Sequence, residues 1–391
     1  MKKRIFTGLE NLITNPPDYL KGKRLGLLCN PASVDHHFTH ASRLIDHIFP
    51  GQLKILFSPQ HGFHGEKQDN MVESGHFMEP DLNIPVFSLY KDTRIPSKDM
   101  FDPIDVLLID IQDVGTRVYT FIYTVSFCLE MAAKLHKRVV ILDRPNPIGG
   151  TQVEGNVLSE AFASFVGRFP IPMRHGLTIG EISQLFNREF HLGCDLTIIP
   201  MNGWKRQMYW QDTGLVWIPP SPNLPTPQSC MVYPGQVIFE GTNISEGRGT
   251  TLPFEQFGAP FLDPKKIKAQ ADKVIKGAWL RPVHFEPTSG KWQGRVCKGF
   301  HLHVTSPIDF KPYISALILL QLMFKFHPDD VKFKSPPYEY EFEKLPIDLI
   351  LGSKTLRKNL VDFKNLALVS DQWKKELEQF NDCSKKYRLY E

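Results

Sequence analysis

Three polar clusters in the first half of the chain carry residue types that could do chemistry. They are Pro59–Glu66 (PQHGFHGE), Asp110–Arg117 (DIQDVGTR) and Asp143–Pro147 (DRPNP). Glu66 and Asp113 are the carboxylates best placed by sequence to meet a ligand, and paired carboxylates are typical of general acid and base catalysis. We therefore expect Glu66 and Asp113 to be catalytic. The clusters also supply the predicted ligand-binding side chains Gln60, His61, Arg117, Arg144 and Asn146.

Arginine side chains near these clusters suit an anionic ligand group, because a planar guanidinium can hold a carboxylate through two parallel hydrogen bonds. Arg174 and its neighbour His175, in the stretch MRHG, are further candidates for ligand binding. For Arg117, an internal salt bridge with Asp110 or Asp113 is an equal alternative to ligand binding.

A second polar concentration lies in Phe239–Glu255 (FEGTNISEGRGTTLPFE), where Glu246 and Arg248 are flanked by Gly241, Gly247 and Gly249. Glycine lets the backbone approach a ligand closely or adopt positive φ, although such a turn can also hold a salt bridge without any ligand. Upstream, the proline-dense stretch WIPPSPNLPTPQSCMVYPG indicates a linker or a rigid wall of an active site, and it contains Asn223. We expect Asn223, Glu246 and Arg248 to contact the ligand.

A metal site is an alternative use of the first cluster. The spacing of His61, His64 and Glu66 could supply three ligands, and Asp113 a fourth. A glycine-rich loop does not fix ligand geometry as a helix does, and no HExxH motif is present. We therefore expect these histidines to orient a substrate or a loop, with neither metal nor cofactor bound.

Each polar cluster follows an apolar run of strand length. Continuous apolar character indicates strands that are buried on both faces of a parallel sheet. Helical stretches separate several runs; the clearest is YTFIYTVSFCLEMAAKLHK, and another begins at Thr178, which forms a capping box with Glu181. In such sheets ligands bind outside the carboxyl ends of the strands, so the clusters should share one crevice. The expected strands are Arg24–Asn30, Leu53–Ser58, Ile84–Leu89, Asp105–Asp110 and Arg138–Asp143.

The chain is therefore predicted to be an α/β protein with a Rossmann-like, mostly parallel sheet domain over residues 1–227. The first strand is followed by CNPASVD in place of GxGxxG, so a dinucleotide is not expected. Beyond the proline-dense stretch, GFHLHV alternates like a half-buried strand, Pro312–His327 is an apolar helix and Gln372–Phe380 a short amphipathic one. We expect a smaller α+β domain over residues 228–391.

The charge and the apolar runs of the sequence bear on which partners the protein binds. The 391 residues contain 46 basic and 42 acidic side chains, a net charge of +4 without a basic block, so nucleic acid is not an expected partner. No apolar run is long enough to span a membrane, and the N-terminal segment lacks the apolar core of a signal peptide. The six cysteines form no CxxC pair. We expect a cytoplasmic chain, and nothing in the sequence indicates its oligomeric state.

Taken together, the motifs resemble the NamZ family of exo-β-N-acetylmuramidases, once a domain family of unknown function. The resemblance runs nearly from end to end. It implies a glycosidase that removes N-acetylmuramic acid from the non-reducing ends of peptidoglycan fragments, with its active site between the two domains and an arginine, Arg117, Arg174 or Arg248, on the lactyl carboxylate. The motifs are GLENL, PQHGFHGE, DIQDVGTRVYT, LDRPNPIGG, PMRHGLTIGE, PPSPNLPT, YPGQVIFEGTN, SEGRGTTLPFE, PPYEYE and PIDLILG.

One departure from the family pattern concerns catalysis. The family usually has Pro-Glu-His-Gly in the loop after the second strand, and the resemblance implies that this glutamate is catalytic. Gln60 occupies that position here, and an amide cannot exchange the catalytic proton. Glu66, Asp113 or Glu246 could then supply the acid. Two other functions stay open: a muropeptide-binding protein without catalysis, and a metal-dependent hydrolase of another bond.

Overall fold

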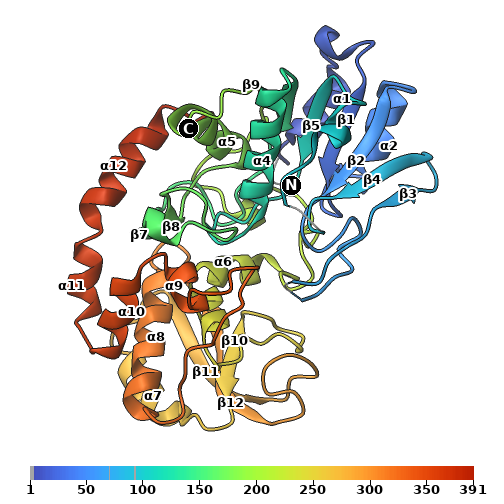
Figure 1. Cartoon of the computed structure of the whole chain (residues 1–391). Coiled ribbons are helices and arrows are strands. Elements are labelled where there is room, and N and C mark those ends of the chain that lie inside the picture. Colours follow the sequence, from blue (N-terminus) through green and yellow to red (C-terminus); the bar gives the residue numbers. More distant parts are fainter. Residues whose placement is uncertain (1–3, 70, 92–93) are drawn as a thin grey trace.

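The computed structural model describes residues 4–69, 71–91 and 94–391, and it is organised around a sheet of seven strands (Figure 1). The strand order is β3-β4-β2-β1-β5-β6-β9, and every neighbouring pair is parallel except β3 with β4. The five predicted strands and the mostly parallel sheet are confirmed. The strands are β1 (Leu25–Cys29), β2 (Leu53–Ser58), β3 (Phe77–Glu79), β4 (Ile84–Ser88), β5 (Val106–Asp110), β6 (Arg138–Leu142) and β9 (Asp195–Ile199).

Successive side chains of a strand point to opposite faces of the sheet, so the apolar strands present apolar side chains on both faces. Helices cover both faces. Leu27 packs with α1 (Gly8–Thr14) and α2 (Ala41–Ile48), whereas Leu28 packs into the core shared with α4 (Phe121–Lys134) and α5 (Ile179–Glu189). The predicted capping box is present at the start of α5: the Thr178 hydroxyl accepts from the Glu181 N–H, and the Glu181 carboxylate accepts from the Thr178 N–H. A four-residue helix, α3, spans Lys98–Phe101.

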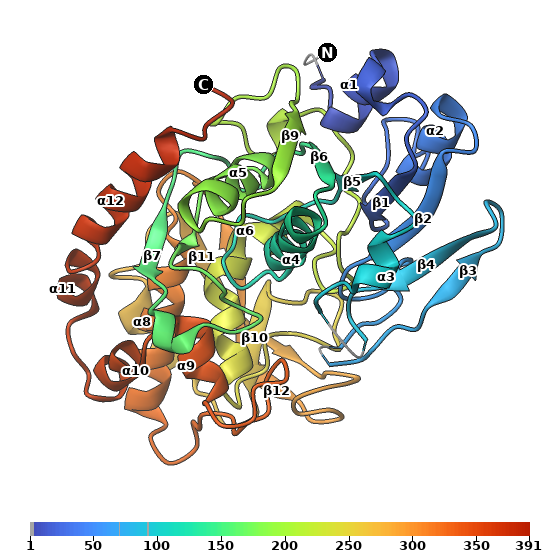
Figure 2. The same cartoon turned by 45° about the horizontal axis from the view of Figure 1, so that its top comes forward.

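The second unit contains a three-stranded antiparallel sheet, β10-β12-β11, with α6 and α8 packed together beside it (Figure 2). The predicted strand and apolar helix are β12 and α8. The proline-dense stretch is not all linker, because its second part forms α6, which Thr226 caps and Pro227 opens. The elements are α6 (Pro227–Gln236), β10 (Gln256–Ala259), α7 (Pro264–Ala271), β11 (Ala278–Phe285), β12 (Cys297–Val304), α8 (Pro312–Phe326), α9 (Pro346–Leu351), α10 (Lys354–Val361), α11 (Leu366–Asp371) and α12 (Lys374–Lys385).

Arg117 joins the two units. Its side chain is fully buried, and its guanidinium donates to the carbonyl oxygens of Asn156 and Ile171 on one side and of Ile350 and Leu351 on the other, at 2.8–3.1 Å. Asn156 belongs to a two-stranded ribbon, β7 (Glu154–Val157) with β8 (Pro172–Arg174), that lies between the units. Arg117 is therefore an interdomain tie, and it forms neither of the salt bridges considered from the sequence.

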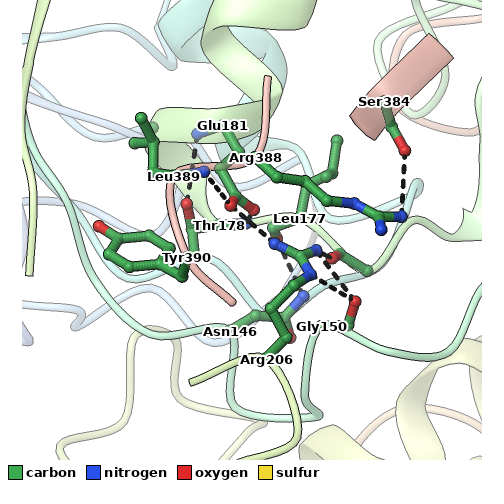
Figure 3. A network of polar contacts seen from close by, with 12 residues as sticks. Asn146, Gly150, Leu177, Thr178, Glu181, Arg206, Ser384, Arg388, Leu389 and Tyr390 are labelled. Atoms are coloured by element: carbon green, nitrogen blue, oxygen red, sulfur yellow. Dashed lines mark hydrogen bonds and ion pairs between the residues drawn. The ribbon is translucent and has the colours of Figure 1, made fainter. Parts of the chain in front are cut away.

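The C-terminal tail makes a second tie. Helix α12 runs from the smaller unit back to α5, where the chain ends (Figure 1). There the Leu389 N–H and the Arg206 guanidinium both donate to the Glu181 carboxylate, at 2.8 and 2.7 Å (Figure 3). The Tyr390 hydroxyl donates to Asp143 at the end of β6. The last residues of the chain are thus bound to the sheet domain.

No helix among residues 4–69, 71–91 and 94–391 is both long and apolar enough to span a lipid bilayer.

Candidate active site

A pocket lies between the sheet domain and the smaller domain. Together with the open solvent at its mouth, it has a volume of about 430 Å³. The sheet domain contributes the loops that follow β2 and β5, Val166 and the proline-dense stretch, and the smaller domain contributes Tyr233 of α6 and residues of its loops. The lining residues are Gln60, His61, Val118, Tyr119, Thr120, Val166, Ser221, Asn223, Leu224, Tyr233, Glu240, Arg248, Phe254, Tyr338 and Glu339.

Glu339 enters this pocket from a tight turn of the smaller domain. Tyr338 and Glu341 exchange two backbone hydrogen bonds, of 2.9 and 3.0 Å, around Glu339 and Tyr340. Both central residues have positive φ, 47° and 66°, which is the pattern of a type I′ turn. Non-glycine residues in this region store backbone strain, and such residues cluster at functional sites. The turn holds the Glu339 carboxyl against the sheet domain.

Gln60 faces Glu339 across the domain boundary. The Gln60 amide nitrogen donates to Glu339 Oε1 at 3.1 Å, and the Thr120 hydroxyl donates to the Gln60 oxygen at 2.7 Å. These two contacts fix which end of the amide faces the carboxyl. On the second oxygen, the Tyr90 hydroxyl donates to Glu339 Oε2 at 2.6 Å. Burial raises the pKa of Glu339, even though the hydrogen bonds from Tyr90 and Gln60 lower it.

Glu240 is the second carboxylate that lines the pocket, and its surroundings differ from those of Glu339. It comes from the 3₁₀ segment Val237–Gly241, pairs with Arg248 Nη2 at 2.8 Å and accepts from the Tyr338 hydroxyl at 2.6 Å. Arg248 also lies over the ring of Phe254. The pocket therefore holds one carboxylate that is paired with a guanidinium and one whose hydrogen-bond donors, Tyr90 and Gln60, are neutral side chains.

Backbone geometry of the SEGRG turn positions Arg248. Gly247 and Gly249 on either side of it have φ of 81° and 76°. A Cβ at Gly247 would lie 2.4 Å from the Gln256 carbonyl oxygen, so only glycine fits there. The neighbouring Glu246 does not line the pocket. Although burial raises its pKa, Lys291 and Arg248 hold the pKa of Glu246 below its ordinary value.

His61 is held as a neutral ring. Its Nδ1 lies 2.7 Å from the carbonyl oxygen of Lys67, so Nδ1 carries the proton and Nε2 is an acceptor. Burial lowers the pKa of His61 to about 4. His64 packs instead against the rings of Phe63 and Phe77. Across the part of the chain that the structure describes, no three His, Cys, Asp or Glu side chains form a group that could hold a metal ion.

Four predicted ligand-binding residues line the pocket together: Gln60, His61, Asn223 and Arg248. The predicted catalytic residue Glu66 does not. Its side chain is exposed, and its carboxylate lies over Gly62 on the outside of the loop. Asp113 is buried beside the pocket wall, where it accepts from the Gly115 N–H at 2.7 Å.

The remaining predicted residues lie in the sheet domain and do not line the pocket. Each contacts a neighbour within the sheet domain. His175 lies 3.4 Å from the Asp113 carboxylate, Arg174 donates to Gln152 and to the Ile148 carbonyl, Asn146 donates to the Leu177 carbonyl, and Arg144 pairs with Asp110.

Arg144 also borders a separate cavity, of about 700 Å³, at the ends of β1, β5 and β6. The segment that carries Ser221 and Leu224 passes between this cavity and the pocket, and the Asn30 side chain binds it through the Pro220 carbonyl. Two charged side chains of the cavity are already paired, since Glu10 is bound by Arg4 and His36, and Arg144 by Asp110. We therefore place the chemistry in the interdomain pocket.

Sequence reasoning missed Glu339, Glu240 and their partners Tyr90 and Tyr338. Glu339 lies in PPYEYE, a motif that supports only the family resemblance. Glu240 lies in the polar stretch Phe239–Glu255, of which only Glu246 and Arg248 were predicted to contact the ligand. The positive φ of two non-glycine residues cannot be recognised from the sequence. The turn that positions Glu339 could therefore not be inferred.

The fold and the pocket define a two-domain α/β protein with a pair of differently partnered carboxylates at the domain boundary. Comparison with known sequences gives its family. The sequence models for the N-terminal and C-terminal domains of exo-β-N-acetylmuramidase NamZ match residues 25–228 and 231–390. The chain belongs to the NamZ family.

Relatives support this membership over the full length. The chain is 39% identical, over 393 aligned positions, to the peptidoglycan β-N-acetylmuramidase NamZ of Bacillus subtilis strain 168, covering 100% of this chain and 92% of that protein. Two crystal structures of DUF1343 family proteins from Bacteroides fragilis are similar. One has a TM-score of 0.90 and 34% identity, covering 99% of both chains. The other has a TM-score of 0.78 and 28% identity, covering 100% of this chain and 99% of that one.

Proposed function

We propose that this protein is an exo-β-N-acetylmuramidase that releases N-acetylmuramic acid from the non-reducing ends of peptidoglycan fragments. The observation that carries the proposal is the pair Glu339 and Glu240 in one interdomain pocket of a NamZ family chain. Glycoside hydrolysis requires a protonated carboxyl at the leaving oxygen and usually a second, ionised carboxylate. The two environments in this pocket supply that difference.

In this mechanism Glu339 is the general acid. Burial keeps its carboxyl protonated to higher pH than an ordinary glutamate, and Gln60 and Tyr90 hold both of its oxygens in place. The proton passes from Glu339 to the glycosidic oxygen as the bond to the anomeric carbon breaks. Gln60 therefore acts as a positioning residue, and the family's glutamate is not needed at that position.

Glu240 is the second carboxylate of the pair. Arg248 and Tyr338 hold its carboxylate, which then stabilises positive charge at the anomeric carbon or accepts a proton from the attacking water. Arg248 is also the one arginine of the three candidates for the lactyl carboxylate that lines the pocket. Its Nε is buried and donates no hydrogen bond within the described residues.

The function is tested with a disaccharide in which N-acetylmuramic acid is β-linked to N-acetylglucosamine. We expect free N-acetylmuramic acid to appear, detected by mass spectrometry. The alternative, a binding protein without catalysis, is motivated by the Gln60 amide. It predicts that the disaccharide binds and stays intact, and that turnover appears only in Gln60→Glu.

The pH dependence tests the role of Glu339 separately. An acid works only while protonated, so kcat/KM should fall as pH rises through the pKa of Glu339, above the ordinary value of 4.5. Tyr90→Phe removes a hydrogen bond that stabilises the carboxylate, so that pKa should rise further. We expect the alkaline limb to move up by as much as about one pH unit.

The control for this experiment is Tyr19→Phe, because Tyr19 lies under Arg138 on another part of the sheet domain. Its limb should coincide with that of the unmodified protein. An alkaline limb that stays in place in Tyr90→Phe, or moves to lower pH, would remove Glu339 from the role of acid.

A further inference from the structure

The cavity that Arg144 borders lies where the strand order of the sheet reverses. From β1 the sheet continues through β2 and β4 on one side, whereas β5 pairs with β1 on the other. In open α/β sheets, ligands bind outside the carboxyl ends of the strands at such a switch point. Residues that follow β1, β5 and β6 line this cavity, and the interdomain pocket shares none of its lining residues.

The lining of this cavity is mostly apolar. Phe38 and Val216 are large apolar side chains of the lining that are exposed to solvent. Covering exposed apolar side chains is favourable, and aromatic side chains such as Trp210 pack well against another ring. The cavity therefore suits a ligand with an apolar ring. Its apolar lining residues are Ala32, Val34, Phe38, Trp210, Leu215, Val216 and Ile218.

The charged residues of the lining are engaged within the protein. Glu10 and Arg144 are paired as described above, and the same carboxylate of Glu10 binds Arg4 and His36. The Asp35 carboxylate accepts from the backbone N–H groups two and four residues further along the chain, at 2.9 and 2.8 Å. A ligand without net charge leaves all of these contacts in place.

Two buried polar atoms of the lining residues have no hydrogen-bond partner among the residues that the structure describes: the Gln112 side-chain oxygen and Trp210 Nε1. The Gln112 nitrogen donates to the carbonyl oxygens of Asp113 and Pro145, at 2.7 and 2.8 Å. Trp210 belongs to the same neighbourhood, because its backbone N–H donates to the Pro147 carbonyl. A buried acceptor or donor without a partner is costly, so its presence calls for an explanation.

We propose that this cavity is a second ligand site, for a neutral small molecule in which an apolar ring carries a carboxamide. The ring packs against the apolar lining. The amide N–H donates to the Gln112 oxygen, and the amide carbonyl accepts from the Trp210 indole N–H. The proposal is independent of the proposed function, because the two sites have no lining residue in common.

The test uses benzamide as the probe, together with acetophenone, in which a methyl group replaces the NH2 group. Binding to the full chain is followed by saturation-transfer difference NMR. We expect benzamide to bind with a dissociation constant of about 1 mM or below. Acetophenone should bind at least about fivefold more weakly, because it has no N–H for Gln112. Trp210→Phe keeps an aromatic ring and removes the indole N–H, so it should weaken benzamide binding about fivefold.

The position of the site is tested with Val216→Trp, which should obstruct the cavity and weaken benzamide binding at least about tenfold. Val274→Trp is the matched control. It makes the same change at an exposed valine after α7 in the smaller domain, and the affinity should stay within about twofold. Unchanged affinity in Val216→Trp would overturn the proposal. So would the absence of saturable benzamide binding up to about 10 mM, or acetophenone binding as tightly as benzamide.

Discussion

Glu339→Gln should lower kcat for the disaccharide by about 10²–10⁴-fold, because the amide cannot deliver a proton to the leaving sugar. The glutamine has the same size and still offers an oxygen to the Tyr90 hydroxyl, so the pocket should keep its shape. The loss should shrink for an aryl β-N-acetylmuramide with a strongly acidic phenol, since that leaving group departs without protonation. The measurement is kcat for both substrates, with circular dichroism as a check on folding.

Glu66→Gln is the matched control for Glu339→Gln. It makes the same chemical change in an exposed side chain outside the pocket, and we expect kcat to stay within about twofold of the unmodified protein. Loss of turnover in Glu66→Gln with retention in Glu339→Gln would reverse the assignment. Loss in neither would move the acid to another group of the pocket.

Arg117→Leu should lower the free energy of unfolding by about 3–5 kcal/mol. The leucine leaves four buried carbonyl oxygens at the domain boundary without the guanidinium that now binds them. Arg117→Lys keeps the charge but reaches fewer of these oxygens, so its effect should be intermediate. Denaturant unfolding of the three proteins measures the difference.

Arg24→Leu controls for the loss of an arginine as such. Arg24 is half exposed and pairs with Asp105 at the surface, so its removal should cost less than about 1 kcal/mol. Equal destabilisation by the two leucine substitutions would contradict the interdomain role of Arg117.

Much of the sheet could be predicted because a strand that is buried on both faces has a continuous apolar sequence. Examples are LGLLC of β1 and VLLID of β5. Strand β9 was not predicted because it lies at the edge of the sheet. It pairs only with β6, and Asp195 at its start is exposed. The capping box of α5 was found because both of its residues lie within one turn. Local rules therefore predicted what local contacts determine.

The candidate site was predicted only in part, because residue type does not specify a partner. Residue type does not distinguish Arg117, Arg174 and Arg248. In the fold, the first two donate hydrogen bonds to buried oxygen atoms of the protein, whereas the third lines the pocket. Gln60 was singled out from the sequence, and it lines the pocket. Its partner Glu339 lies 279 positions further along the chain, a distance that no local pattern spans.

The return of the C-terminal tail to the sheet domain bears on how the protein is made. Synthesis proceeds from the N-terminus, yet Glu181, Arg206 and Asp143 in the first domain obtain partners from Leu389, Glu391 and Tyr390. A nascent chain released only as far as the domain boundary still lacks these contacts. The sheet domain is thus completed by residues 389–391, which are synthesised after the smaller domain.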